Sequence, residues 1–159
     1  GTAISAEKQL SKLEKQVEIL SKKSKGSSGL NATHATVLQL RGLLDLERGR
    51  ETTGLASLRE ATRVQETMPL AYGPPSPVKP PHELLGEVLL KLGHHAEAST
   101  VFAKALKLAP KRALSLLGAA RAARQGGDLR RAEQFYAMLR DVWSKSDALP
   151  ERDEVFSAK

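Results

Sequence analysis

The stretch "HELLGEVLLKLGHHAEASTVFAKALKLAP", residues 82–110, determines the fold. Its small residues and its single Phe stand at fixed intervals. Gly86 is followed by Gly93 after seven residues, by Ala98 after five more and by Phe102 after another four. Ala and Leu, which fill most of the remaining positions, favour helix. Spacings of three and four residues return a side chain to the same face of a helix. We therefore expect two helices, joined by a turn at Gly93, that cross closely at small residues.

The same pattern recurs before and after this stretch. Thirty-four residues further on, small or aromatic residues again occupy the matching positions, namely Ala120, Gly127, Ala132 and Tyr136. Forty-four residues earlier, after allowance for a ten-residue insertion, the matches are Gly42, Gly49, Gly54, Leu58 and Ala61. A period of thirty-four residues is typical of helix–turn–helix repeats. The chain thus contains three such segments, 35–68, 79–112 and 113–146.

These segments resemble the tetratricopeptide repeat family, most closely in 79–112 with "LLGEVLLKLGHHAEASTVFAKALKLAP". The segment 113–146 keeps "GGDLRRAEQFYAML", and 35–68 keeps "RGLLDLERGRETTGLASLREA". The resemblance implies an all-α fold, a right-handed superhelix of three helix–turn–helix units with an N-terminal capping helix. Within the family, "GPPSPVKPPHELLGE" is similar to bacterial repeat proteins of unassigned role, a likeness that indicates no function.

Periodicity predicts seven helices, at residues 4–24, 33–47, 52–67, 80–92, 95–108, 112–125 and 129–143. We expect an N-terminal helix and flexible connector in 1–29, a repeat domain in 30–146 and a polar tail in 147–159. The connector is "SKGSSG", residues 24–29. The first helix has an apolar stripe made of Leu10, Leu13, Val17 and Leu20. We expect this stripe to pack on the first repeat; a short coiled coil is the alternative.

A proline-rich insertion, "PLAYGPPSPVKPP", occupies residues 69–81. Its residues 69–78 lie between the first two repeats, 35–68 and 79–112. The insertion holds six of the eight prolines, and such a segment favours an extended polyproline conformation. We expect a stiff linker that sets the angle between two repeats. The alternatives are a ligand for a proline-reading domain or a lip over a binding groove.

Composition excludes several kinds of site. The chain has no cysteine, so it has neither disulfides nor thiolate sites; this is compatible with the cytoplasm, although the compartment stays open. The chain has no run of eighteen apolar residues, so no membrane-spanning helix is predicted. The net charge of +7 is spread along the chain, and aromatic residues make up only 4%. Both features argue against nucleic acid as the partner.

No pattern of catalytic or metal-binding residues is present. The histidines are expected at the surface rather than in a metal site, because no cysteine or close acidic residue completes a ligand set; they are His34, His82, His94 and His95. Glu83 and Glu87 lie one helical turn apart, but acid–base work would need a pocket that shifts one pKa. We expect a solvated helix face, and hence no enzyme, cofactor or metal.

The resemblance implies where a partner would bind. In repeats of this kind the first helix of each unit lines a concave groove. The expected groove residues are Gln39, Leu43, Glu83, Glu87, Leu90, Leu117, Arg121 and Arg124. Arg121 and Arg124 share one helix face, although both could instead be solubilising charges. The Lys and Asn pattern with which some family members clamp a terminal carboxylate is absent from these positions.

The sequence thus favours a non-enzymatic scaffold that binds a peptide or protein in the concave groove. The alternative is an accessory or regulatory repeat domain excised from a larger, possibly enzymatic, protein. That alternative is motivated by the first residue, which is Gly1 rather than Met. We accordingly expect a processed chain or a fragment.

Overall fold

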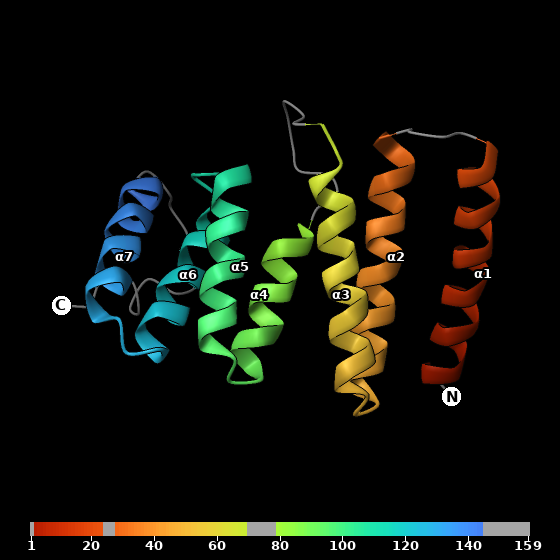
Figure 1. Ribbon diagram of the computed structural model, residues 1–159, viewed down its shortest axis with the longest axis horizontal. Coiled ribbons are helices and arrows are strands. Elements are labelled where there is room, and N and C mark those ends of the chain that lie inside the picture. Colours follow the sequence, from red (N-terminus) through yellow and green to blue (C-terminus); the bar gives the residue numbers. More distant parts are fainter. Residues whose placement is uncertain (1, 24–27, 70–78, 145–159) are drawn as a thin grey trace. The chain divides into compact units, whose positions relative to one another are not determined.

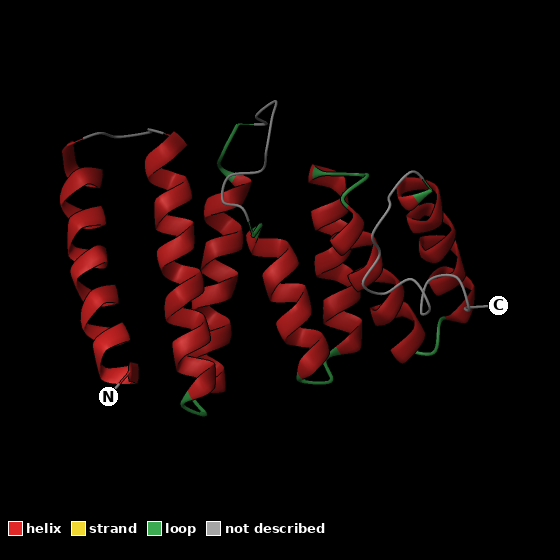
Figure 2. Ribbon diagram, turned by 180° about the vertical axis from the view of Figure 1, so that it is seen from behind, coloured by secondary structure: helices red, strands yellow, loops and turns green. Residues whose placement is uncertain are grey.

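A computed structural model describes residues 2–23, 28–69 and 79–144, and within these ranges the chain is helical with no strand (Figures 1 and 2). The helices in chain order are α1 (Thr2–Lys23), α2 (Ser28–Glu47), α3 (Glu51–Glu66), α4 (Pro81–Lys91), α5 (His95–Leu108), α6 (Ala113–Gln125) and α7 (Leu129–Trp143). All seven predicted helices are present. The all-α repeat fold expected from the sequence is therefore confirmed.

The start of α2 is the largest difference from the predicted helix ends. The helix begins at Ser28 rather than at residue 33, so the end of the predicted flexible connector is helical. The longer helix carries Leu30, which packs against a buried cluster formed by Leu10, Val17 and Val37. Residues 24–27 of the connector, residues 70–78 of the proline-rich insertion and the tail 147–159 lie outside the described residues.

The turns between paired helices depend on glycine. Gly49, Gly93 and Gly127 have φ angles of 72°, 80° and 85°, while no other type of residue has a positive φ among those described. An L side chain is strained in this conformation, whereas glycine adopts it at little cost. In each turn the backbone N–H of the glycine also bonds a carbonyl of the preceding helix. The turns predicted from the spacing of these glycines are confirmed.

The repeat positions that were expected to be small or large are buried as expected. Ala98, Phe102 and Leu58 are at most 1% exposed. The matching positions of the last repeat are equally covered, because Ala120, Ala132 and Tyr136 form its core together with Leu116, Leu117, Ala123 and Leu139. Within each unit, successive helices therefore bury one face against each other, as α2 does against α3 and α6 against α7.

The chain divides into two compact units, an N-terminal unit of residues 1–84 and a C-terminal unit of residues 85–159. The division lies inside α4. It differs from the predicted boundaries at residues 29 and 146, and those boundaries stay predictions. The right-handed superhelix of three stacked repeats also stays a prediction.

Helix α1 packs against α2 in the N-terminal unit. The two helices run antiparallel, with α3 on the other side of α2 (Figure 1). Leu10 and Val17 of α1 are buried with Val37 of α2 in one cluster. The prediction that the apolar stripe of the first helix packs on the first repeat is confirmed, although Leu20 is 51% exposed.

Candidate functional site

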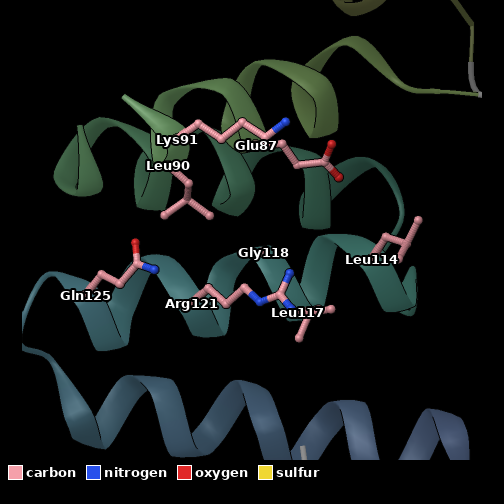
Figure 3. A pocket seen from close by; sticks show the side chains of 8 residues that line it. All are labelled: Glu87, Leu90, Lys91, Leu114, Leu117, Gly118, Arg121 and Gln125. Atoms are coloured by element: carbon pink, nitrogen blue, oxygen red, sulfur yellow. The ribbon is translucent and has the colours of Figure 1, made fainter. Parts of the chain in front are cut away.

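The C-terminal unit contains a cavity of about 400 Å³ between α4 and α6, which we call the α4–α6 cavity. Three of its lining residues come from α4 and the other five from α6, and the two sets face each other across the cavity (Figure 3). The lining consists of Glu87, Leu90, Lys91, Leu114, Leu117, Gly118, Arg121 and Gln125. Its volume lies within the range of about 300–1,000 Å³ that ligand sites occupy.

Helical periodicity brings these residues to one surface. On α6 the lining positions Leu114, Leu117, Arg121 and Gln125 are three or four residues apart, so they share a face. The opposite face of α6 carries Leu116, Ala119, Ala120 and Ala123, which are all buried. The same helix thus contributes a core face and a cavity face, and Leu117, which is 2% exposed, lies where the two meet and belongs to both.

Gly118 forms part of the cavity wall, and the ring of Phe102 lies directly against it. A Cβ atom added at Gly118 would collide with Cζ, Cε1 and Cε2 of that ring. Phe102 is fully buried, so its ring fixes the position of α6 from behind the wall. The shape of the cavity is therefore set by the same repeat position that builds the core.

Of the eight predicted groove residues, the structure brings four together in the α4–α6 cavity, namely Glu87, Leu90, Leu117 and Arg121. Leu43 lines a different surface, between α1 and α2 of the N-terminal unit. Arg124 is exposed, and its guanidinium carbon lies 5.9 Å from the centre of the Tyr136 ring, within the range of a cation–π contact. It is not among the residues that line the cavity.

Two predicted groove residues are buried and have structural partners. Gln39 is 5% exposed and its Nε2 donates a hydrogen bond to the carbonyl oxygen of Lys79, at 2.9 Å. Glu83 is fully buried, with its Oε1 3.3 Å from the Nζ of Lys79. Buried polar groups need such partners. The prediction that Gln39 and Glu83 present their side chains to a groove, and that Glu83 lies on a solvated face, is wrong.

His82 is also buried rather than at the surface, being 1% exposed. Its backbone N–H donates to Oε1 of Gln65 at 3.2 Å, and its ring Nδ1 lies 2.7 Å from the same oxygen. Its Nε2 lies 3.1 Å from Oε1 of Glu66. The ring thus connects the start of α4 to the end of α3. Among the described residues no group of three His, Cys, Asp or Glu side chains could hold a metal.

Four cavity residues were not predicted, Lys91, Leu114, Gly118 and Gln125. A signal for three of them was present in the spacing. Lys91 follows the predicted Glu87 by four residues, Gln125 follows Arg121 by four, and Leu114 precedes Leu117 by three. Periodicity alone would therefore have extended the predicted face. Gly118 carries no side chain, and only the position of the Phe102 ring indicates its role.

The comparisons with known proteins bear on the second predicted repeat. Residues 81–112 match the family model of the tetratricopeptide repeat. The match supports the resemblance to this family that the sequence showed. It coincides with the part of the chain in which the resemblance was closest. A comparison with curated proteins found no match.

Tetratricopeptide repeats in general mediate protein–protein interaction, and an all-helical fold of this type is typically non-catalytic. They bind proteins or peptides. In the part of the chain that the structure describes, every helix is too short or too polar to cross a membrane. The segment 81–112 that matches the family model contains α4, which supplies one wall of the cavity.

Proposed function

We propose that this protein is a non-enzymatic scaffold that binds a peptide or protein segment in the α4–α6 cavity. The observation that carries the proposal is the composition of the lining. Leu90 and Leu114, which is 45% exposed, provide apolar surface, while Glu87 and Arg121 supply opposite charges from the two facing helices (Figure 3). An apolar pocket with a few convergent polar groups is the usual form of a binding site.

The charges of the lining indicate the chemistry of the partner. The cavity has two cationic side chains, Lys91 and Arg121, and one anionic side chain, Glu87. A partner with an acidic side chain or a terminal carboxylate directed at Arg121 therefore suits it, with a basic side chain toward Glu87. Charge pairs of this kind fix the orientation of a bound peptide more than they add affinity.

The charge reversal Arg121→Glu tests this proposal. A natural partner would be recovered by affinity purification on the purified protein, and its affinity measured by calorimetry. We expect Arg121→Glu to weaken binding by more than tenfold, roughly 1.4 kcal/mol, with unchanged helical content. Arg124→Glu is the matched control, because Arg124 is one turn further along α6 and does not line the cavity. We expect it to change affinity by less than about threefold.

Equal effects of the two reversals would place the partner outside the cavity and contradict the proposal. The second possibility is a nucleic-acid-binding protein, which is tested by measuring binding to single- and double-stranded oligonucleotides over a series of salt concentrations. Binding whose affinity falls steeply with salt would support it.

A further inference from the structure

The N-terminal unit has an apolar surface that the proposed function does not use. Helices α1 and α2 leave a groove of about 460 Å³ between them, lined by Gln9, Leu10, Leu13, Leu40, Leu43, Leu44 and Glu47. We call it the leucine groove. Leu40 and Leu43 are 44% and 39% exposed, although they are large and apolar. Leu43 was one of the groove residues expected from the sequence.

The leucine groove lies on one flank of the contact between α1 and α2, and ion pairs lie on the other. At 100° per residue, Leu10 and Val17 of α1 point toward α2, Gln9 and Leu13 lie to one side, and Glu7 and Glu14 lie to the other. Glu14 accepts two hydrogen bonds from Arg41, at 2.9 and 2.5 Å. Glu7 accepts two from Arg48, both at 2.7 Å.

These paired hydrogen bonds hold α1 in one position on α2. The bond to Glu14 raises the pKa of Arg41, and the bond to Glu7 raises the pKa of Arg48, so both cations are stabilised where they are. Bidentate pairs between Arg and a carboxylate also fix geometry. The walls of the leucine groove are therefore set before a partner arrives, which lowers the cost of binding.

One end of the leucine groove carries a negative charge that no described residue matches. Glu47 is exposed, and among the described residues it has neither a hydrogen bond nor an ion pair. Three arginines near it in the sequence bond other carboxylates, because Arg41, Arg48 and Arg50 pair with Glu14, Glu7 and Asp45 respectively. Glu47 is also the last residue of α2, whose final turn contains no basic residue. The negative end of the helix dipole adds to its charge.

We infer that the leucine groove binds a peptide segment of a partner protein that places aliphatic side chains on Leu40 and Leu43 and a Lys or Arg against Glu47. The apolar lining accounts for the aliphatic part, and the unmatched carboxylate accounts for the cation. This partner needs a basic group alone, whereas the one proposed for the α4–α6 cavity carries both an acidic and a basic group. The two surfaces share no residue, so either assignment stands without the other.

Selection from a random peptide library on the immobilised chain of residues 1–159 tests the inference. We expect enriched peptides to contain Leu, Ile, Val or Met within about four residues of a Lys or Arg, the reach of one helical turn. A representative peptide, synthesised with a fluorescent label, would then be measured by fluorescence polarisation. Leu43→Ser should weaken it by more than about tenfold. Arg121→Glu is the control, and should leave its affinity within about twofold.

The charge requirement has its own test. Glu47→Lys should weaken binding of the same peptide. It should strengthen binding of a second peptide in which the Lys or Arg is replaced by Glu. Such an exchange of preference depends on a direct charge pair, and a general loss of stability would not produce it. Helical content by circular dichroism accompanies each variant. If Leu43→Ser is not folded, Leu40→Ser replaces it, because Leu40 is more exposed.

Three results would overturn the inference. The first is a library selection without enrichment of aliphatic–basic peptides. The second is an enriched peptide whose affinity is indifferent to Leu43→Ser and Glu47→Lys. The third is sedimentation showing a dimer of the wild-type protein that Leu43→Ser dissociates, since a second copy of the chain would then cover the groove. If Arg121→Glu does not weaken binding of the natural partner in the calorimetric assay, this inference is unaffected.

Discussion

The two units make the same helix crossing in different ways. In the N-terminal unit, Gly42 of α2 lies against Gly54 of α3, and a Cβ atom added to either would be 2.9 Å from the carbonyl oxygen of the other. In the C-terminal unit, Gly86 of α4 lies against the ring of Phe102, and a Cβ atom added there would be 2.7 Å from Cζ of that ring. At the first crossing the added Cβ atoms would also be 2.7 Å from a leucine side chain, Cγ of Leu58 at Gly42 and Cγ of Leu46 at Gly54. The first contact thus involves both backbone and side chain, whereas the second is with the Phe102 ring alone.

The difference shows what the large residue of the repeat determines. Leu58 occupies this position in the N-terminal unit, and both crossing residues there are glycine. Phe102 occupies it in the C-terminal unit, where Ala98 replaces the second glycine and is still fully buried. We attribute the room for this methyl group to the larger ring. A side chain can also move, whereas a carbonyl oxygen in a helix cannot, so the two crossings should respond differently to the same substitution.

Removal of the large residue should have the largest effect. Phe102→Ala should destabilise the protein by about 3–5 kcal/mol, because the ring is fully buried against glycines of both α4 and α6. We expect Leu58→Ala to cost less, about 2–4 kcal/mol, since a smaller side chain is lost. Urea unfolding followed by circular dichroism measures both. Leu129→Ala is the control, because Leu129 is 67% exposed, and should change stability by less than about 0.5 kcal/mol. A larger loss from Leu58→Ala would reverse the comparison.

Small substitutions at the crossings test the difference directly. Gly86→Ala and Gly42→Ala should each cost about 1–3 kcal/mol through overpacking. In a double-mutant cycle, Phe102→Leu should relieve much of the cost of Gly86→Ala, giving a coupling energy of about 1–3 kcal/mol.

The matching cycle in the N-terminal unit pairs Gly42→Ala with Leu58→Val. Here the carbonyl oxygen of Gly54 still blocks the new methyl group, so the coupling should be clearly smaller. Equal coupling energies from the two cycles would show that the backbone at the first crossing can shift, contrary to our account.

Much of the fold could be predicted from the sequence because its determinants are local. Gly49, Gly93 and Gly127 are needed where φ is positive, whatever surrounds them. The small residues at helix crossings recur at a fixed period for a similarly simple reason, which is the distance between two helix backbones. The start of α2 was predicted less well, because Leu30 extends the helix through a contact with α1.

The candidate site could be predicted only in part, because periodicity identifies the face of a helix but not what covers it. Glu83 and Glu87 are one turn apart on α4 and share a face, yet Glu83 is fully buried whereas Glu87 lines the cavity. Gln39 is covered because it bonds the carbonyl oxygen of Lys79, forty residues away in the sequence. Contacts at such separation leave no periodic pattern in the sequence.

The smallest expected effect concerns how α1 is attached, which is a further difference between the units. The hydrogen bonds from Arg48 lower the pKa of Glu7 below its ordinary value of 4.5. A lowered pKa in the folded state contributes stability above pH 4.5, and that stability is lost as the pH falls through the lowered value. Acid should therefore loosen α1 before it affects the contact of α6 with α7, whose core is apolar.

Amide hydrogen exchange at pH 5 and pH 3 measures this, as protection factors for Leu10 and Val17 compared with Leu116 and Leu139. We expect protection to fall slightly at the first pair only. Glu7→Gln should lower protection of that pair at pH 5 and remove part of its pH dependence, because the glutamine does not titrate. If protection of the first pair falls equally in the wild type and in Glu7→Gln, another carboxylate holds α1, and Glu14, which bonds Arg41, is the one to replace next.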